Sequence, residues 1–278
     1  MTTVRHRRIP RIGTYASLVA ASLVMLVPLV VILMAALKSD DEFRAEGPLN
    51  PPSNWLNPNN FITALTDGDM IGAFLNTTII LVISVTGTIL IGSMAAYALD
   101  RFRFRLRALV VLLFLVATLV PSVTTQVATF QVVNALGLFN TRAAAIFLYM
   151  GTDIVTIYIF LQFLRSIPHE LDEAAALDGA SRLTIYWRII LPLLRPAIAT
   201  VVIIKGVYIY NEFYVPFLYM PSRDLGVVST SLFRFLGPFS AKWEVISAGV
   251  VIALIPTLIV FLALQRWIYN GFTSGSTR

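Results

Sequence analysis

One short stretch of a strongly apolar chain gathers four acidic side chains: Ser166–Pro196, SIPHELDEAAALDGASRLTIYWRIILPLLRP. Grouped carboxylates can accept hydrogen bonds and pair with Lys or Arg side chains of another protein. The run Ala174–Ala176 favours a helix, so the acids are expected to stand on one. The stretch therefore indicates a docking surface rather than a catalytic centre. The acids are Glu170, Asp172, Glu173 and Asp178.

Capping residues divide the same stretch into two short helices. Ser166 can cap the first helix, and Gly179 stops it or kinks it. Ser181 can cap a second helix, Arg182–Leu191, which is expected to end at Pro192. The stretch is too polar to cross a bilayer and too ordered to be a simple linker.

Helical spacing places Leu171, Ala174, Ala175 and Asp178 on one small, nearly flat face. Such a face can approach the backbone of another protein closely. The alternative is a solvated amphipathic hairpin that lies on the membrane and only spaces two spans. A loop of ten residues could do that spacing, so an ordered stretch three times longer favours a partner.

A second set of polar residues lies inside apolar runs: Asp153, Lys205 and Glu212, with Asn211 and Tyr214 beside the last. A charge at mid-membrane costs about 2.5–3.5 kcal/mol, so each should face protein or water. Lys205 and Glu212 are separated by about 10 Å along a helix, which makes Asp153 the natural partner of Lys205. A structural ion pair and a substrate contact are both open. Asn211, Glu212 and Tyr214 fit a solute pathway or gate, interhelical hydrogen bonds, or an interfacial aromatic belt.

Other chemistry is missing from the sequence. The chain has no Cys, and its two histidines, His6 and His169, are far apart, so no metal site is expected. It has no phosphate-binding Gly-x-x-x-x-Gly-Lys-Ser/Thr motif, so it cannot hydrolyse ATP by itself. No convergent set of residues suggests an enzyme. The net charge of +6 sits mainly at the ends of apolar runs, which indicates membrane orientation and not nucleic-acid binding.

Six apolar segments are long enough to position these residues in a bilayer. Of the 278 residues, 57% are hydrophobic and only 13% charged, with a mean hydropathy of +0.79. A helix needs about 20 apolar residues to cross the hydrocarbon core. The sequence therefore predicts an all-α membrane protein, with kinks at prolines such as Pro121. The predicted spans are Thr14–Leu37, Phe74–Leu99, Ala108–Ala128, Ala143–Leu164, Ala197–Met220 and Ile246–Trp267.

The basic residues give the orientation. Segments 1–13, 100–107, 165–196 and 265–278 hold fourteen of the 21 Lys and Arg, and the other connecting segments hold six. Positive charge marks the cytoplasmic side, so both termini and the Ser166–Pro196 stretch are expected there, at a bacterial cytoplasmic membrane. This predicts a cytoplasmic N-terminus over 1–13, a six-span domain over 14–267 that includes the loop 165–196, and a cytoplasmic tail over 268–278.

The order Glu173-Ala174-Ala175, Gly179, Ile189, Leu191-Pro192 resembles the Glu-Ala-Ala loop of permease subunits in ATP-binding-cassette (ABC) importers. In that family the loop separates Glu-Ala-Ala from Gly by three residues, Gly from Ile by nine, and Ile from Leu-Pro by one. Every position fits. The resemblance implies the fold of type I ABC importer permeases, with a cytoplasmic two-helix coupling loop.

Two further stretches resemble the maltose-type carbohydrate importers. YNEFYVPFLYM (Tyr210–Met220) is similar to their Asn-Glu-Phe…Pro signature. QRWIYNGFTSGSTR (Gln265–Arg278) is similar to the tail of their second permease subunit. The resemblance therefore implies a carbohydrate importer, in which this chain is the second of two permeases.

The resemblance also implies partners. These are two ABC ATPase subunits that bind ATP and Mg²⁺, a second permease, an extracytoplasmic solute-binding protein, and the bilayer. The first short helix would dock on an ATPase, with Glu173 bonded to it and Gly179 allowing the turn. The residues implied in coupling are Glu170, Glu173, Ala174, Ala175, Asp178, Gly179, Leu191 and Pro192.

Two alternatives stay open on the sequence. One is an ABC importer permease for another solute, such as glycerol phosphate or a polyamine. The other is an ion-coupled secondary transporter that works alone, with Asp153, Lys205 and Glu212 as a proton relay. The ordered hairpin and the lack of an evident internal repeat count against the latter.

Overall fold

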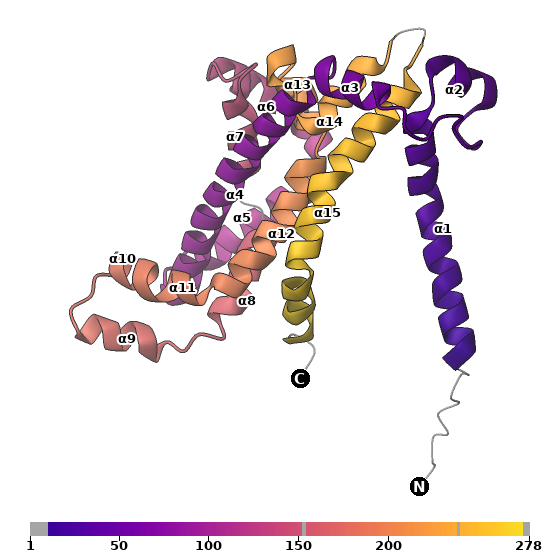
Figure 1. Cartoon of the computed structure of the whole chain (residues 1–278). Coiled ribbons are helices and arrows are strands. Elements are labelled where there is room, and N and C mark those ends of the chain that lie inside the picture. Colours follow the sequence, from indigo (N-terminus) through magenta and orange to yellow (C-terminus); the bar gives the residue numbers. More distant parts are fainter. Residues whose placement is uncertain (1–10, 152–153, 238–239, 275–278) are drawn as a thin grey trace. The chain divides into compact units, whose positions relative to one another are not determined.

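The structure is a computed structural model that describes residues 11–151, 154–237 and 240–274. Regular structure in these ranges is helical, apart from an isolated bridge between Leu236 and Ala241 (Figure 1). The helices are α1 (Arg11–Leu37), α2 (Asp40–Glu46), α3 (Asn59–Thr66), α4 (Met70–Arg101), α5 (Arg107–Leu119), α6 (Ser122–Ala135), α7 (Arg142–Met150), α8 (Ile154–Leu164), α9 (Glu170–Leu177), α10 (Arg182–Ile185), α11 (Leu191–Leu193), α12 (Arg195–Asn211), α13 (Tyr214–Tyr219), α14 (Val228–Ser231) and α15 (Trp243–Ser274). A π turn, Tyr186–Ile190, joins α10 to α11, and 3₁₀ turns occur at Arg223–Leu225 and Leu232–Phe235.

The chain divides into two compact units. One unit contains Met1–Met70 and Leu232–Val260, and the other contains Ile71–Ser231 and Phe261–Arg278.

In the first unit, the loop after α1 folds back on the end of that helix. Asn60 of α3 donates from Nδ2 to the carbonyl oxygens of Ala36 (2.8 Å) and Lys38 (2.6 Å). Lys38 is fully buried, and its Nζ donates to the carbonyl of Gly47 at 2.8 Å. These bonds satisfy carbonyl groups that a helix end otherwise leaves without partners, so they order the loop.

The second unit has two apolar clusters around α4. One cluster joins α4 to α8, α12 and the segment 185–194, with Phe160, Tyr186 and Leu194 among its buried members. The other joins α4 to α7 and α12 through residues such as Ile80 and Tyr149. Helix α4 is therefore the common element of both cores.

Three helices are long and apolar enough to cross a membrane: Gly13–Leu37 in α1, Met70–Arg101 in α4, and Trp243–Leu262 in α15. Three further pairs of helices, each bent at a short break, reach this length and apolar character when the two helices of a pair are taken together. This gives up to six crossings in the described residues. The bends are 106° between α5 and α6, 47° between α7 and α8, and 72° between the α10–α11 segment and α12.

Each of the third, fourth and fifth predicted spans therefore consists of two helices with a break between them, and the kink expected at Pro121 in the third span is present. Pro121 separates α5 from α6, and Val120 before it is extended (φ −79°, ψ 116°), as a residue before proline prefers. The fourth predicted span is interrupted after Met150. The fifth is interrupted at Glu212, which is also extended (φ −69°, ψ 125°).

Candidate functional site

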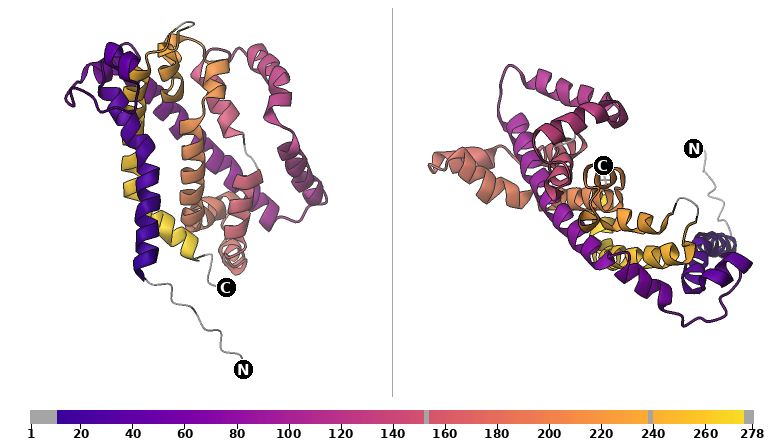
Figure 2. Two further views of the ribbon diagram at one scale, coloured as in Figure 1. Left: turned by 90° about the vertical axis from the view of Figure 1, so that its right-hand side faces the viewer. Right: turned by 90° about the horizontal axis from the view of Figure 1, so that it is seen from above.

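The predicted docking stretch forms a helical hairpin, Glu170–Leu193, made of α9, α10, the π turn and α11. Figures 1 and 2 show this hairpin projecting from the other helices of its unit. The first arm, α9, carries three acids in its first turn, where the helix dipole favours negative charge. Ser166 does not cap it. The hydroxyl of Ser166 instead donates to the carbonyl of Phe163 at 2.6 Å, and α9 begins later, after His169.

Gly179 ends the first arm in the left-handed conformation, with φ of +82°. Its N–H donates to the carbonyl of Ala176 (3.1 Å), and the N–H of Ala180 donates to that of Ala175 (3.0 Å). This arrangement is a Schellman-type C-terminus, in which glycine carries the positive φ at no steric cost. The sequence placed the turn correctly.

The second arm begins as predicted and ends later. The hydroxyl of Ser181 accepts a bond from the N–H of Thr184 at 3.2 Å, which caps α10. The helical course then continues through the π turn to Leu193, so Pro192 does not end it. Pro192 lies instead at the start of α11, directly after the π turn.

The hairpin exposes most of the residues implied in coupling. Ala175 and Leu191 are half-buried against the core around α4, α8 and α12. The predicted shared face of α9 is thus split, since Leu171, Ala174 and Asp178 are exposed while Ala175 packs inward. The exposed coupling residues are Glu170, Glu173, Ala174, Asp178, Gly179 and Pro192.

Asp172 lies on the opposite side of α9 and is buried. Its Oδ1 accepts a bond from the hydroxyl of Tyr97 at 2.9 Å. Its Oδ2 lies 3.0 Å from Nε of Arg101, and the two side chains are only 5% and 2% exposed. Nη2 of Arg101 also donates to the carbonyl of Ile167 at 2.9 Å. The hairpin is therefore tied to the last turn of α4.

Sequence reasoning missed this group of residues. Asp172 stands between Leu171 and Glu173 among other acids, and nothing in its immediate sequence distinguishes a buried carboxylate from exposed ones. A weak signal existed in its spacing of three from Ala175, which places both on one helix face. Arg101 was counted only as one of the basic residues that set orientation.

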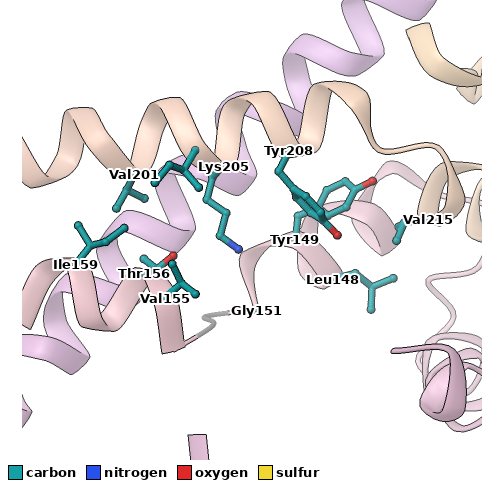
Figure 3. A pocket seen from close by; sticks show the side chains of 11 residues that line it. Leu148, Tyr149, Gly151, Val155, Thr156, Ile159, Val201, Lys205, Tyr208 and Val215 are labelled. Carbon is teal, nitrogen blue, oxygen red and sulfur yellow. The ribbon is translucent and has the colours of Figure 1, made fainter. Parts of the chain in front are cut away.

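The second predicted set is divided by the structure. Lys205 lines a cavity of about 410 Å³ between α7, α8 and α12, together with Tyr149 and Tyr208 (Figure 3). Its ammonium lies 5.8 Å from the centre of the Tyr208 ring, within cation–π range. The hydroxyl of Tyr149 is buried and has no hydrogen-bond partner among the residues that the structure describes. The other lining residues are small or apolar, such as Thr156, so the cavity mixes aromatic faces with few polar groups.

Glu212, Asn211 and Tyr214 are not among the residues that line this cavity. Glu212 accepts backbone bonds at Oε1 from Tyr214 (2.7 Å) and Val215 (3.3 Å), so it caps the start of α13. Nδ2 of Asn211 donates to the carbonyl of Val207 at 2.8 Å, within its own helix. Tyr214 is 43% exposed. Asp153, the expected partner of Lys205, lies outside the described residues.

Comparison with known proteins identifies the family. The binding-protein-dependent transport system inner membrane component family matches residues 88–274, which include the hairpin and the cavity. A crystal structure of a bacterial ABC transporter involved in the import of the acidic polysaccharide alginate aligns with a TM-score of 0.81, over 96% of this chain and 99% of that one. At 21% identity, this likeness concerns the fold.

Curated relatives match along the whole chain. The melibiose/raffinose/stachyose import permease protein MelC of Bacillus subtilis (strain 168) is 30% identical and covers 100% of both chains. The probable starch degradation products transport system permease protein AmyC of Thermoanaerobacterium thermosulfurigenes is 31% identical over 94% of each chain. The trehalose/maltose transport system permease protein MalG of Thermococcus litoralis is 29% identical over 99% of each. With its helical fold and its family match, this chain belongs to the inner membrane components of binding-protein-dependent transport systems.

Proposed function

We propose that this chain is a permease subunit of an ABC importer that moves a sugar into the cytoplasm. The observation that carries the proposal is the hairpin, which exposes acids on a short helix of an otherwise apolar chain. The names of the relatives support a saccharide: they refer to melibiose and raffinose, to starch degradation products, and to trehalose and maltose. Mono- and oligosaccharides are both within this proposal.

The hairpin is proposed to dock on an ATPase subunit. Glu170, Glu173 and Asp178 are exposed and can bond Lys, Arg or backbone N–H groups of that partner. The small side chain of Ala174, between these acids, lets the surface of the partner approach α9 closely. Gly179 fixes the angle at which the second arm returns to the membrane, so a push on α9 reaches α12 through the second arm.

The proposed complex contains this chain, a second related permease, two ATPases that bind ATP and Mg²⁺, and an extracytoplasmic solute-binding protein. Both termini of this chain and the hairpin lie on the cytoplasmic side. Closure of the ATPases on ATP moves the hairpin and favours the outward-facing state, and hydrolysis returns the path inward. Coupling then means that nucleotide and binding protein prefer the same conformation of the permeases.

The solute path is proposed to pass the cavity between α7, α8 and α12. Tyr149 and Tyr208 offer aromatic surface against which sugar rings can pack. The hydroxyl of Tyr149 and the ammonium of Lys205 offer hydrogen-bond donors. Asn211, Glu212 and Tyr214 belong to the break between α12 and α13, at which the path is proposed to be gated.

Reconstitution into vesicles tests the proposal. We expect uptake of a labelled oligosaccharide when the chain is present with its second permease, the ATPases, the binding protein and ATP. Omission of ATP or of the ATPases should abolish uptake. Accumulation driven by this chain alone in an ion gradient would contradict the proposal and favour a secondary transporter. Uptake of glycerol phosphate or a polyamine, and not of sugars, would keep the importer and change its solute.

Cysteine scanning tests the docking surface, since the natural chain contains no Cys. Single cysteines at Glu170, Glu173 and Ala174 should crosslink to an ATPase subunit in the assembled complex, because these positions are exposed. A cysteine at the half-buried Ala175 serves as the control and should crosslink less. Failure at all exposed positions would remove the docking assignment.

A further inference from the structure

Helix α4 carries a polar junction at each of its ends. At the end that includes Arg101, the hairpin is tied to it by Tyr97 and Arg101 through Asp172. A second tie links the other arm of the hairpin, because the hydroxyls of Ser93 and Tyr186 lie 2.7 Å apart in a buried site. Both arms of the hairpin are therefore bonded to α4, although α4 is not its neighbour in sequence.

The other end of α4 holds the segment Asp224–Val228. Nδ2 of Asn76 donates to the carbonyls of Asp224 (2.9 Å) and Gly226 (2.9 Å). The hydroxyl of Thr77 accepts from the N–H of Val228 at 3.0 Å. Asn76 and Thr77 are buried, so this junction is shielded from competing water.

The helix between the two junctions is continuous. α4 contains no proline, and from Asn76 to Arg101 it extends about 37 Å at 1.5 Å per residue. It also lies in the two apolar clusters that join it to α7, α8 and α12. A helix bonded at both ends and packed along its length transmits a displacement from one end to the other better than a loop can.

We propose that Tyr97 and Arg101 are positioning residues that bind α9 through Asp172, so that α9 and α4 move as one body and α4 carries the movement to Asp224–Val228. The inference rests on the proposed function, in which the ATPases displace α9. It adds a path across the membrane that does not pass through α8 or α12, the helices directly connected to the hairpin. The junction stays closed throughout the transport cycle.

A purely stabilising role for the junction makes a different prediction. In that case, its variants would lower the amount of assembled complex, and whatever complex remained would move as much sugar per ATP as the natural one. A positioning role lowers the ratio of sugar moved to ATP hydrolysed in complex that is fully assembled. The ratio therefore separates the two roles.

The first experiment measures that ratio in vesicles for Asp172→Asn, Tyr97→Phe and Arg101→Lys. We expect a fall of about tenfold or more for Asp172→Asn, because it removes the buried ion pair that joins α9 to Arg101, whose other charged partner, Asp100, lies on α4 itself, while ATP hydrolysis continues. Matched controls are Tyr158→Phe, which removes a phenol hydroxyl from an exposed side chain, and Arg165→Lys, on an exposed arginine just before the hairpin. The controls should leave the ratio unchanged.

The double variant Tyr97→Phe with Asp172→Asn adds a test of cooperation. If both residues act through one junction, the double variant should be no worse than Asp172→Asn alone. Independent, multiplying losses would show that Tyr97 acts elsewhere and would overturn its assignment.

The second experiment follows movement directly. Spin labels on cysteines at the exposed positions Leu177 of α9 and Met94 of α4 report the distance between the two helices. We expect that distance to stay the same with and without ATP in the natural background, and to change with ATP in Asp172→Asn. A change in the natural background, or the same fixed distance in the variant, would overturn the inference.

Failure of the inference is distinguishable from failure of the proposed function. If the complex with the natural chain shows no ATP-driven sugar uptake, the proposed function fails. If it transports sugar and all three junction variants keep its ratio, only the role of the junction fails.

Discussion

Substitution of Gly179 tests the turn of the hairpin most directly, because glycine has no side chain and contributes only its backbone conformation. With φ of +82°, it occupies a conformation that other residues avoid, and a Cβ built there meets nothing within 4 Å. Gly179→Ala therefore adds no clash and changes only the preferred φ. Gly179→Pro goes further, because it fixes φ near −65° and removes the N–H that donates to Ala176.

The magnitudes follow from these differences. An alanine in the left-handed region costs about 1–2 kcal/mol, which shifts the population of the native turn by roughly 5–30-fold if the turn can rearrange alone. The proline variant loses about 3 kcal/mol or more, so the turn must rebuild. We expect Gly179→Ala to lower sugar transport per ATP measurably, and Gly179→Pro to abolish it while the chain still inserts and the ATPases still hydrolyse ATP.

Gly137 provides a matched control. It has φ of +67°, nothing within 4 Å of a built Cβ, and the same bonding pattern, since the N–H of Leu138 donates to the carbonyl of Val133 at 3.0 Å. Gly137→Ala should therefore cost similar stability in thermal unfolding, without uncoupling transport from hydrolysis. If Gly179→Pro leaves coupling intact, or if Gly137→Ala uncouples as strongly as Gly179→Ala, the role given to the hairpin turn is refuted.

Other predictions concern packing and charge away from the hairpin. Gly87→Ala should lower thermal stability by about 1–3 kcal/mol, because a Cβ there meets the side chain of Met150, and adding Met150→Ala should recover part of the loss. Lys38→Met should lower the free energy of unfolding by about 1–3 kcal/mol, because it leaves the carbonyl of Gly47 without its buried donor. As the control, Lys242→Met changes an exposed side chain and should alter the free energy of unfolding by less than about 0.5 kcal/mol. A backbone N–H that donates to Glu42 lowers the pKa of its carboxyl below 4.5, so its contribution to stability should be present above pH 4.5 and disappear as the pH falls through that lowered pKa. In Glu42→Gln this pH dependence should be absent from unfolding curves, and an unchanged curve would contradict the assignment.

The best predictions from the sequence were the spans whose apolar run forms one continuous helix. Thr14–Leu37 and Phe74–Leu99 correspond to α1 and α4 with small shifts at their ends. Length and hydropathy are sufficient to predict such helices, because lipid cannot bond the backbone N–H and C=O groups and a helix satisfies them internally. Length and hydropathy do not predict where an apolar run bends. Pro121 was expected to produce a kink, but a proline alone does not specify the 106° angle between α5 and α6.

The hairpin was predictable for a different reason: its capping and turn residues act locally. Ser181 and Gly179 fix backbone conformations within a few residues, and the structure has both features where they were expected. Asp172 depends on Tyr97 and Arg101, which are about 70 positions away in sequence. Its burial is a tertiary property, and a local pattern of acids does not contain it. The capping role of Glu212 was missed because the break before α13 was not foreseen.

Little of helix α1 touches other described residues. Only 6% of the most apolar part of α1 is buried. The family match begins at residue 88, well after α1 ends. Its packing within the chain is concentrated where the loop after it folds back on its end. Sequence change along most of α1 therefore meets few constraints from this polypeptide and is limited mainly by lipid or by a neighbouring subunit. We therefore expect the exposed surface of α1 to vary more between related chains than the buried faces of α4 and α8.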